Sequence, residues 1–277
     1  MGYRVENGWL VGTHGNTVLR SESPNHGGEI VPEFLVVHFT AGRSAKSSVA
    51  WLCNPESKVS AHLVIGRDGS VTQLVAFNRR AWHAGRSQWA GRSDLNSCSI
   101  GIELDNKGKL HRAGSQWKSW FGEVVPDEEV AEAIYKDEHV RSGWHTYSAE
   151  QLEALTQVGA ALATQYKLRD VMGHEDIAPG RKNDPGPLFP MESFRASVLG
   201  RDEGEIPVYV CTSVLNLRSE PSSSAAKIVP SGLPVGTEVR SLGEHSGSWW
   251  RVLVLTPING DSDLEGWVHS KYLARKD

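Results

Sequence analysis

Cysteine, long hydrophobic runs and a surplus of one charge are all scarce in this chain of 277 residues. The three cysteines, Cys53, Cys98 and Cys211, lie far apart and form no C-x-x-C pair, which argues against a disulfide framework and a thiolate-rich zinc finger. No apolar run approaches the roughly 18 residues that a membrane-spanning helix needs. We therefore expect a water-soluble chain.

Neither sign of charge dominates. The 29 basic and 33 acidic residues give a formal net charge of −4, and residues 201–277, with 8 basic and 10 acidic residues, contribute −2 of it. Nucleic-acid phosphates and anionic lipid surfaces attract chains with a basic surplus. We therefore expect no nucleic acid and no membrane among the partners, and a monomer.

A polar stretch at residues 201–206 predicts a linker, because it contains glycine and ends at Pro207, where a helix cannot continue. Before it, apolar strand patterns alternate with helical patterns. After it come short β-type runs broken by turn residues. The sequence thus predicts an α/β domain over residues 1–200 and a small all-β domain over residues 207–277.

Two runs of strand length stand out in the N-terminal part. Residues 34–39 and 99–104 are almost continuously apolar, which is typical of strands covered on both faces. Asp68-Gly69 predicts a hairpin turn between two shorter apolar runs. Together these patterns predict a sheet at the centre of the domain.

Helical patterns follow two of these strands. Residues 45–53 predict a short helix that ends before a proline. Residues 147–166 predict the longest helix, because apolar residues recur at helical spacing and Ser148 and Gln151 have the spacing of a capping box. The polar stretch at residues 106–146 is a long excursion whose function the sequence does not indicate.

Polar side chains interrupt the apolar strands at places where burial is costly. His38 lies near the end of one run, Glu103 breaks the other, and His174 and Asp184 bracket a later loop. Two imidazoles and one carboxylate, with a fourth position left for water, form the pattern of a catalytic zinc site. The alternative is a satisfied core histidine with an ordinary loop aspartate, and the residue types alone leave it open.

The loop at residues 173–187 contains three prolines, Pro179, Pro185 and Pro187. Each proline fixes its own φ, so the loop loses less conformational freedom when it orders. A metal site requires ligands that are held in place before the ion arrives. The prolines therefore favour a rigid ligand loop.

Five motifs occur in order along most of residues 9–190. They lie at residues 36–38, 60–62, 81–85, 99–104 and 173–187. In this order they resemble the zinc-dependent N-acetylmuramoyl-L-alanine amidases of the AmpD type. The resemblance implies the fold shared by AmpD and the peptidoglycan recognition proteins, which is a mixed central β-sheet flanked by helices.

The resemblance also implies an activity and a set of site residues. The family's Zn2+ ligands match His38, His174 and Asp184, its catalytic carboxylate matches Glu103, and its active-site lysine matches Lys182. The implied reaction is hydrolysis, by zinc-activated water, of the amide between N-acetylmuramic acid and L-alanine of the stem peptide. Peptidoglycan or muropeptides would be the partners.

Substrate contacts are less sharply indicated. His83 and Trp82 match a motif that lines the cleft in the family, and Trp82 or Trp89 is a candidate for stacking on a sugar. Phe39 follows the first ligand where AmpD has a polar asparagine, so substrate detail is expected to differ there. Arg67 is a candidate partner for a stem-peptide carboxylate, with a solvated turn residue as the alternative.

The C-terminal runs resemble bacterial SH3-like domains. The similarity rests on residues 215–222, 249–252 and 266–273, and it implies a small barrel that binds the cell wall. The alternative is a stabilising appendage without a ligand. Tethering a catalyst to a wall anchor raises the effective concentration of substrate around the active site.

Two other functions remain open at this point: a peptidoglycan receptor without catalysis, and a zinc peptidase that cuts within the stem peptide. Receptors of this fold usually lack a metal ligand, and all three are present here. The anchor-like domain favours polymeric wall over released anhydro-muropeptide. Residues 1–6 show no signal peptide, so we expect synthesis in the cytoplasm and action at the cell wall after lysis or dedicated secretion.

Overall fold

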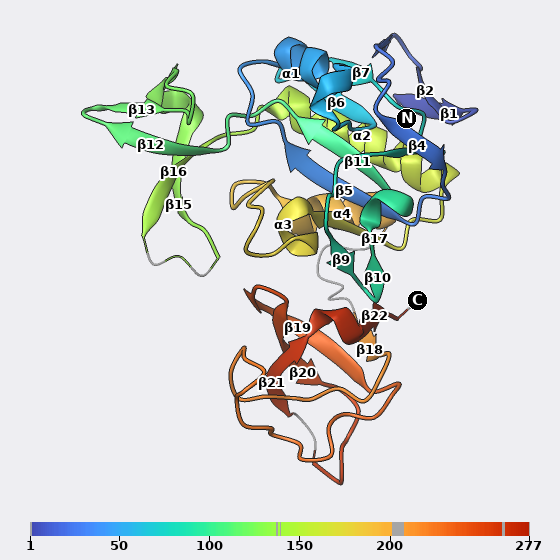
Figure 1. Ribbon diagram of the computed structural model, residues 1–277, viewed down its shortest axis with the longest axis vertical. Helices are drawn as coiled ribbons and strands as arrows, with labels where there is room; N and C mark the ends of the chain where they lie inside the picture. The colour runs from blue at the N-terminus through green and yellow to red at the C-terminus, as the bar shows by residue number, and fades with distance from the viewer. Residues whose placement is uncertain (1, 137, 139, 201–207, 262–263, 277) are drawn as a thin grey trace. The chain divides into compact units, whose positions relative to one another are not determined.

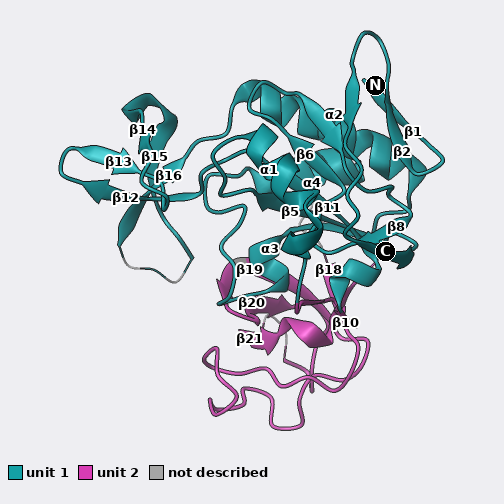
Figure 2. Ribbon diagram, turned by 45° about the horizontal axis from the view of Figure 1, so that its top comes forward, with its two compact units in different colours: residues 1–85, 94–203 teal, residues 86–93, 204–277 magenta. Residues whose placement is uncertain are grey.

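The computed structural model describes residues 2–136, 138, 140–200, 208–261 and 264–276. Two compact units are present, residues 1–85 with 94–203 and residues 86–93 with 204–277 (Figure 2). The predicted linker at residues 201–206 lies outside the described residues, so the domain limits stay a prediction. Residues 86–93 group with the C-terminal unit, which the sequence did not predict.

A six-stranded sheet forms the centre of the first unit (Figure 1), with the strand order β17-β5-β11-β6-β7-β3. Strands β17, β5, β11 and β6 are parallel, and β7 runs antiparallel to β6, so the predicted mixed sheet is confirmed. The predicted hairpin turn at Asp68-Gly69 joins β6 to β7. The bounds are β3 Val18–Arg20, β5 Phe34–Phe39, β6 Leu63–Ile65, β7 Val71–Gln73, β11 Ser99–Leu104 and β17 Asp170–Gly173.

Helices cover both faces of this sheet because side chains alternate along each strand. On β6, Leu63 and Ile65 pack in the cluster that contains Leu155 of α2, whereas Val64 packs in the cluster that contains Leu52 of α1. The helices are α1 Ala45–Leu52, α2 Ala149–Gln165, α3 His174–Ile177 and α4 Met191–Leu199. The predicted helices are thus present, and the α/β class is confirmed.

The N-terminal cap of α2 differs from the capping box that the sequence predicted. Ser148 accepts a hydrogen bond from the backbone N–H of Gln151, as expected. The Gln151 side chain, however, is fully buried and donates to the carbonyl oxygens of Ile65 and Asp105 at 2.9 and 3.2 Å. Buried carbonyl groups at strand ends require a hydrogen-bond donor inside the protein. The Gln151 side chain satisfies two of them instead of bonding back to the backbone of Ser148.

The polar excursion folds as a separate antiparallel sheet with the order β14-β13-β12-β16-β15 (Figure 1). We call residues 106–146 the insertion. Its buried centre is Trp144, and His145 accepts a hydrogen bond from the Lys107 N–H at Nδ1 and bonds Glu129 through Nε2. The strands are β12 Lys109–Ala113, β13 Gln116–Lys118, β14 Val124–Val125, β15 Val130–Ile134 and β16 Arg141–His145, and the short 3-10 helix η3 covers Asp127–Glu129.

Short elements complete the first unit. Two-stranded sheets pair β1 Tyr3–Glu6 with β2 Trp9–Gly12 and β4 His26–Glu29 with β8 Arg79–Ala81, and the 3-10 helices η1 and η2 cover Pro55–Ser57 and Leu95–Ser97. In the part of the chain that the structure describes, no helix has the length and hydropathy needed to cross a membrane.

The second unit is built from strands. Its five-stranded antiparallel sheet has the order β21-β20-β19-β18-β22, and residues 86–93 add the hairpin β9–β10. Within this unit Trp89 is buried and its ring lies 4.9 Å from that of Trp250, so it is not placed to stack on a sugar. The bounds are β9 Gln88–Trp89, β10 Arg92–Ser93, β18 Val208–Cys211, β19 Glu238–Ser246, β20 Trp249–Val254, β21 Glu265–His269, η4 Ser270–Tyr272 and β22 Leu273–Arg275.

Candidate metal centre and active site

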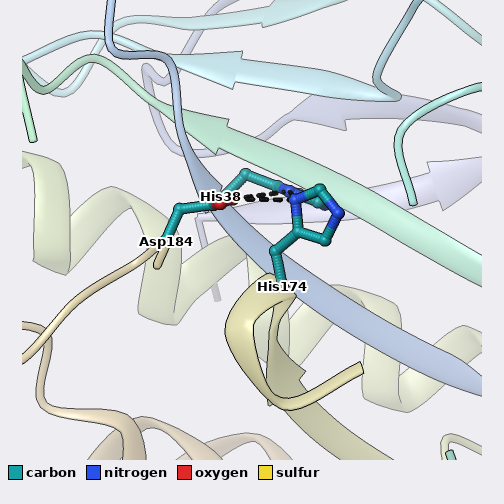
Figure 3. A group of neighbouring side chains, drawn as sticks. All are labelled: His38, His174 and Asp184. Carbon is teal, nitrogen blue, oxygen red and sulfur yellow. Dashed lines mark hydrogen bonds and ion pairs between the residues drawn. The ribbon is translucent and has the colours of Figure 1, made fainter. Parts of the chain in front are cut away.

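Three buried side chains converge at one end of the central sheet. Figure 3 shows His38 on β5, His174 at the start of α3 and Asp184 on the loop after it. The two Nδ1 atoms lie 2.9 Å apart, and each lies 3.0 Å from Oδ2 of Asp184. The structure therefore brings together the three residues that the sequence proposed as metal ligands.

The parallel register of the sheet explains why these residues meet. Gly173 at the end of β17 pairs with Val37 on β5, so His174 follows beside His38. The N–H of Glu175 then donates to the carbonyl oxygen of Asp184 at 2.8 Å, which folds the loop back onto α3. Backbone pairing, rather than a chance contact of side chains, sets the positions of the ligands.

Hydrogen bonds on the far side of each imidazole define which nitrogen faces the cluster. Nε2 of His174 donates to the carbonyl oxygen of Ala84 at 3.1 Å. Ser99 donates its hydroxyl to the carbonyl oxygen of Leu95, so its oxygen accepts from Nε2 of His83 at 3.2 Å. The other nitrogen of His83, Nδ1, then accepts from Nε2 of His38 at 3.0 Å.

This arrangement leaves a lone pair on Nδ1 of both His38 and His174. Burial, and then the nearby His174, lower the pKa of His38 to about 4, so its imidazole is neutral at neutral pH. Two lone pairs and a carboxylate oxygen thus face one another at 2.9 to 3.0 Å, an arrangement that a cation stabilises.

The dimensions and chemistry of the triangle fit zinc. Edges of 2.9 to 3.0 Å place its centre roughly 1.7 Å from each atom, slightly less than Zn–N and Zn–O distances of about 2.0 to 2.2 Å. His38, His174 and Asp184 would therefore be able to hold such an ion together. Outer hydrogen bonds that fix the imidazole tautomers are typical of such sites.

Glu103 lies beside this cluster. On β11 it pairs in register with His38 on β5, so the two side chains are on the same face of the sheet. Its Oε2 is buried without a hydrogen-bond partner among the described residues. Burial, and then the charge of Asp184, raise the pKa of Glu103 to about 8, while Lys182 opposes the shift.

Lys182 is exposed and lies two residues before Asp184 on the ligand loop. Tyr135 of the insertion donates to its carbonyl oxygen at 3.3 Å, and the neighbouring Lys136 pairs with Glu175 and Asp176 at 3.3 and 3.2 Å. Contacts from the insertion thus hold both ends of the segment from α3 to Lys182.

A groove of about 920 Å3 opens over these residues. His174, Asp184, Glu103 and Lys182 line it, as do three of the predicted substrate contacts, Phe39, Trp82 and His83. Since both ring nitrogens of His83 bond within the protein, only its ring surface is available to a ligand.

Arg67 is placed differently. It is not among the described residues that line the groove, and its guanidinium donates to the carbonyl oxygen of Thr146 at 2.7 Å. It also lies 3.8 Å from a carboxylate oxygen of Glu129. These contacts connect the hairpin turn to the insertion, which is a structural role for the side chain.

Several lining or supporting residues have no signal of their own in the sequence. Ser99 sets the tautomer of His83, Arg181 donates to the carbonyl oxygen of Ala84 at 3.0 Å, and Trp51 and Trp120 line the groove. A weak signal existed for Trp120 alone, because it forms an aromatic pair with Phe121 in a polar stretch.

Comparisons with known proteins show the family of the chain. Residues 28–187 match the family described as N-acetylmuramoyl-L-alanine amidase, and residues 213–274 match the bacterial SH3 domain. The chain is 32% identical over 216 residues to 1,6-anhydro-N-acetylmuramyl-L-alanine amidase AmpD of Escherichia coli (strain K12), covering 70% of this chain and 96% of that protein. It is 33% identical over 175 residues to N-acetylmuramoyl-L-alanine amidase AmiD of the same organism, covering 60% of this chain and 53% of AmiD.

Two solved structures are also similar. A selenomethionine derivative of AmpD has 29% identity and a TM-score of 0.47 and covers 70% of this chain and 98% of its own. The complex of Escherichia coli AmiD with the substrate anhydro-N-acetylmuramic acid-L-Ala-D-gamma-Glu-L-Lys has 28% identity and a TM-score of 0.46, covering 74% and 68%. The chain is a hydrolase of amide bonds, and its site contains a His-His-Asp group that could hold a metal ion. The chain belongs to the N-acetylmuramoyl-L-alanine amidase family and also contains a bacterial SH3 domain.

Proposed function

We propose that the chain is a Zn2+-dependent amidase that hydrolyses the bond between N-acetylmuramic acid and L-alanine in peptidoglycan. The observation that supports this most is the convergence of three metal donors beside a groove that His174, Asp184 and Glu103 line. The buried carboxylate oxygen of Glu103 has no hydrogen-bond partner among the described residues. The proposed site of action is the cell wall, and the proposed working form is a monomer.

His38, His174 and Asp184 would hold the ion. When bound, Zn2+ polarises a carbonyl group and makes water acidic enough to supply hydroxide near neutral pH. The hydrogen bonds from His38 to His83 and from His174 to Ala84 keep both imidazoles in the tautomer that binds metal. The protein thus prepares the site before the ion binds.

Glu103 would move the protons of the reaction. Its Oε2 has no hydrogen-bond partner to displace among the residues that the structure describes, so it would be available to take a proton from the attacking water and deliver it to the leaving amine of L-alanine. Burial and then the nearby Asp184 raise the pKa of Glu103 to about 8. A cation among the ligands would oppose the effect of Asp184 and favour the ionised form that a base needs.

Lys182 would stabilise the negative charge that develops on the scissile carbonyl oxygen. Its position on the ligand loop keeps the ammonium group near the reacting bond, and the Tyr135 contact steadies its backbone. Phe39, Trp82 and the ring surface of His83 would contact the substrate along the groove. The SH3 domain would bind the cell wall and keep the enzyme near its substrate.

The test is product analysis on purified sacculi. An amidase exposes L-alanine amino groups and frees peptides from glycan without new reducing ends, whereas a stem-peptide peptidase exposes other amines and a receptor yields no product. Chelation should abolish cleavage and added Zn2+ should restore it. Activity that survives complete chelation would refute the metal mechanism.

A further inference from the structure

The groove extends beyond the residues that the reaction uses. It is also lined by Trp51 of α1, by Arg43 of the loop after β5, and by Trp120 and Phe121 of the insertion, none of which the proposed reaction uses. A volume of about 920 Å3 is near the upper end of the roughly 300 to 1,000 Å3 that small-ligand pockets occupy. The groove therefore has room for more than one sugar and its amide.

Trp120 is an exposed ring with its polar group already satisfied. Trp120 is 72% exposed, yet its indole Nε1 donates to the carbonyl oxygen of Ala41 at 2.8 Å. The hydrogen bond fixes the indole on the backbone next to the groove and leaves the ring surface open. Since aromatic rings usually gain stability from burial, an anchored and exposed ring indicates a contact surface for a ligand.

Neighbouring side chains extend this surface. The Phe121 ring lies 5.4 Å from that of Trp120 at an angle of 86°, and the Arg43 guanidinium lies 5.1 Å from the Phe121 ring centre. Trp51, from a separate element, is 58% exposed. We call Trp51, Trp120 and Phe121 the aromatic rim. Its members come from α1 and from the insertion.

The chemistry of the aromatic rim fits carbohydrate better than stem peptide. Pyranose rings present faces of C–H groups that stack on the electron-rich faces of aromatic rings, and their hydroxyl groups accept hydrogen bonds from a guanidinium such as that of Arg43. Stem peptides contain carboxylates, which Arg43 could also bind but with which none of the three rings can pair.

We propose that the aromatic rim is a glycan subsite that binds the sugars next to the N-acetylmuramic acid residue whose amide is cut. The inference rests on the proposed amidase function and adds a substrate preference to it. An extended glycan chain bearing stem peptides would gain contacts at the rim that an N-acetylmuramyl peptide with a single sugar lacks. The enzyme should therefore favour the chain over the single-sugar substrate.

The experiment compares these two soluble substrates, with the same stem peptide, in full-length enzyme loaded with Zn2+. Trp120→Ala should lower kcat/KM on the chain by roughly three- to tenfold, the loss expected for one aromatic contact. On the single-sugar substrate it should change kcat/KM by less than about twofold. Trp120→Phe should recover part of the loss, because it restores a ring.

Val124→Ala is the matched control, since Val124 is 44% exposed on the insertion and does not line the groove. It should leave both rates unchanged. Titration of a peptide-free glycan chain should quench tryptophan fluorescence in the wild type and less in Trp120→Ala. Equal loss on both substrates, or no loss on either, overturns the glycan subsite. If wild-type enzyme releases no L-alanine amino groups from either substrate, the proposed function itself fails.

Discussion

Gly101→Ala should weaken zinc binding although Gly101 touches no ligand. Gly101 lies on β11 beneath the His83 ring, and a Cβ at this position would be 2.4 Å from Cγ and 2.5 Å from Nδ1 of His83. Ordinary contacts begin near 3.4 Å, so the ring must move by about 1 Å. Its hydrogen bond to His38, now 3.0 Å, would lengthen past the limit for such a bond.

The size of the effect follows from the role of that hydrogen bond. Without it, Nε2 of His38 no longer has a fixed acceptor, and the imidazole loses its preference for the tautomer with the lone pair on Nδ1. Loss of an outer partner of a metal ligand typically costs 10- to 100-fold in metal affinity. That range corresponds to about 1.4 to 2.7 kcal/mol of binding free energy.

Competition against a chromophoric chelator measures the zinc dissociation constant of each variant. Gly159→Ala is the control, because its Cβ would lie 2.5 Å from Val198 in the contact between α2 and α4, and neither residue lines the groove. It should change the Tm but not the zinc affinity. Ser99→Ala, which removes the acceptor for His83 without added bulk, should weaken zinc binding in the same direction. A folded Gly101→Ala protein with wild-type zinc affinity would refute the orienting role of His83.

Three further predictions concern the catalytic groups and stability. Glu103→Gln should lower turnover by roughly 10²- to 10⁴-fold and still bind zinc, whereas His174→Ala should lose both turnover and zinc. Measuring the zinc content and the rate of product release of each variant checks this, and a Glu103→Gln variant with near-normal turnover would contradict it. Burial lowers the pKa of His145 to about 4, so below pH 6.5 the unfolded chain binds more protons than the folded one. Acidification from pH 7 to pH 5 should therefore lower the free energy of unfolding by about 2 kcal/mol. Urea unfolding should show a weaker dependence of this free energy on pH for His145→Gln than for the wild type, and an unchanged dependence would contradict the prediction. Tyr147→Phe removes the hydroxyl that donates to the Pro185 carbonyl at 2.7 Å and should lower the free energy of unfolding by about 1 kcal/mol, measurable as a lower denaturation midpoint; an unchanged midpoint would show that this bond adds nothing.

The parts of the site that follow from backbone pairing were predictable from sequence. Residues 34–39 and 99–104 are apolar enough to predict buried strands, and a polar residue in each, His38 and Glu103, is costly enough to suggest a function. Once the strands are adjacent and parallel, the register places the two residues side by side. Local signals therefore define the centre of the site.

Features that depend on packing between distant segments could not be predicted. The tautomer of His38 depends on Ser99 through His83, and no pattern in the sequence connects these three positions. The Gln151 side chain was expected to complete the cap of α2, but in the structure it donates hydrogen bonds to the carbonyl groups of Ile65 and Asp105 at two strand ends. Residues of this kind respond to partners that only the tertiary structure supplies.

The insertion contacts both the groove and the loop that contains Lys182. Through Trp120 it contributes to the groove, and through Tyr135 and Lys136 it holds the loop that contains Lys182 and the segment that follows His174. Trp144 is 2% exposed, and a Cβ on Gly186 would lie 2.8 Å from its ring, so the buried centre of the insertion packs against the loop that follows α3. The insertion therefore connects the proposed glycan subsite to the loop that positions Lys182, the proposed catalytic lysine. Substitutions in the insertion should therefore change substrate choice and the position of this loop, whereas substitutions of the proposed metal ligands should change the binding of the ion.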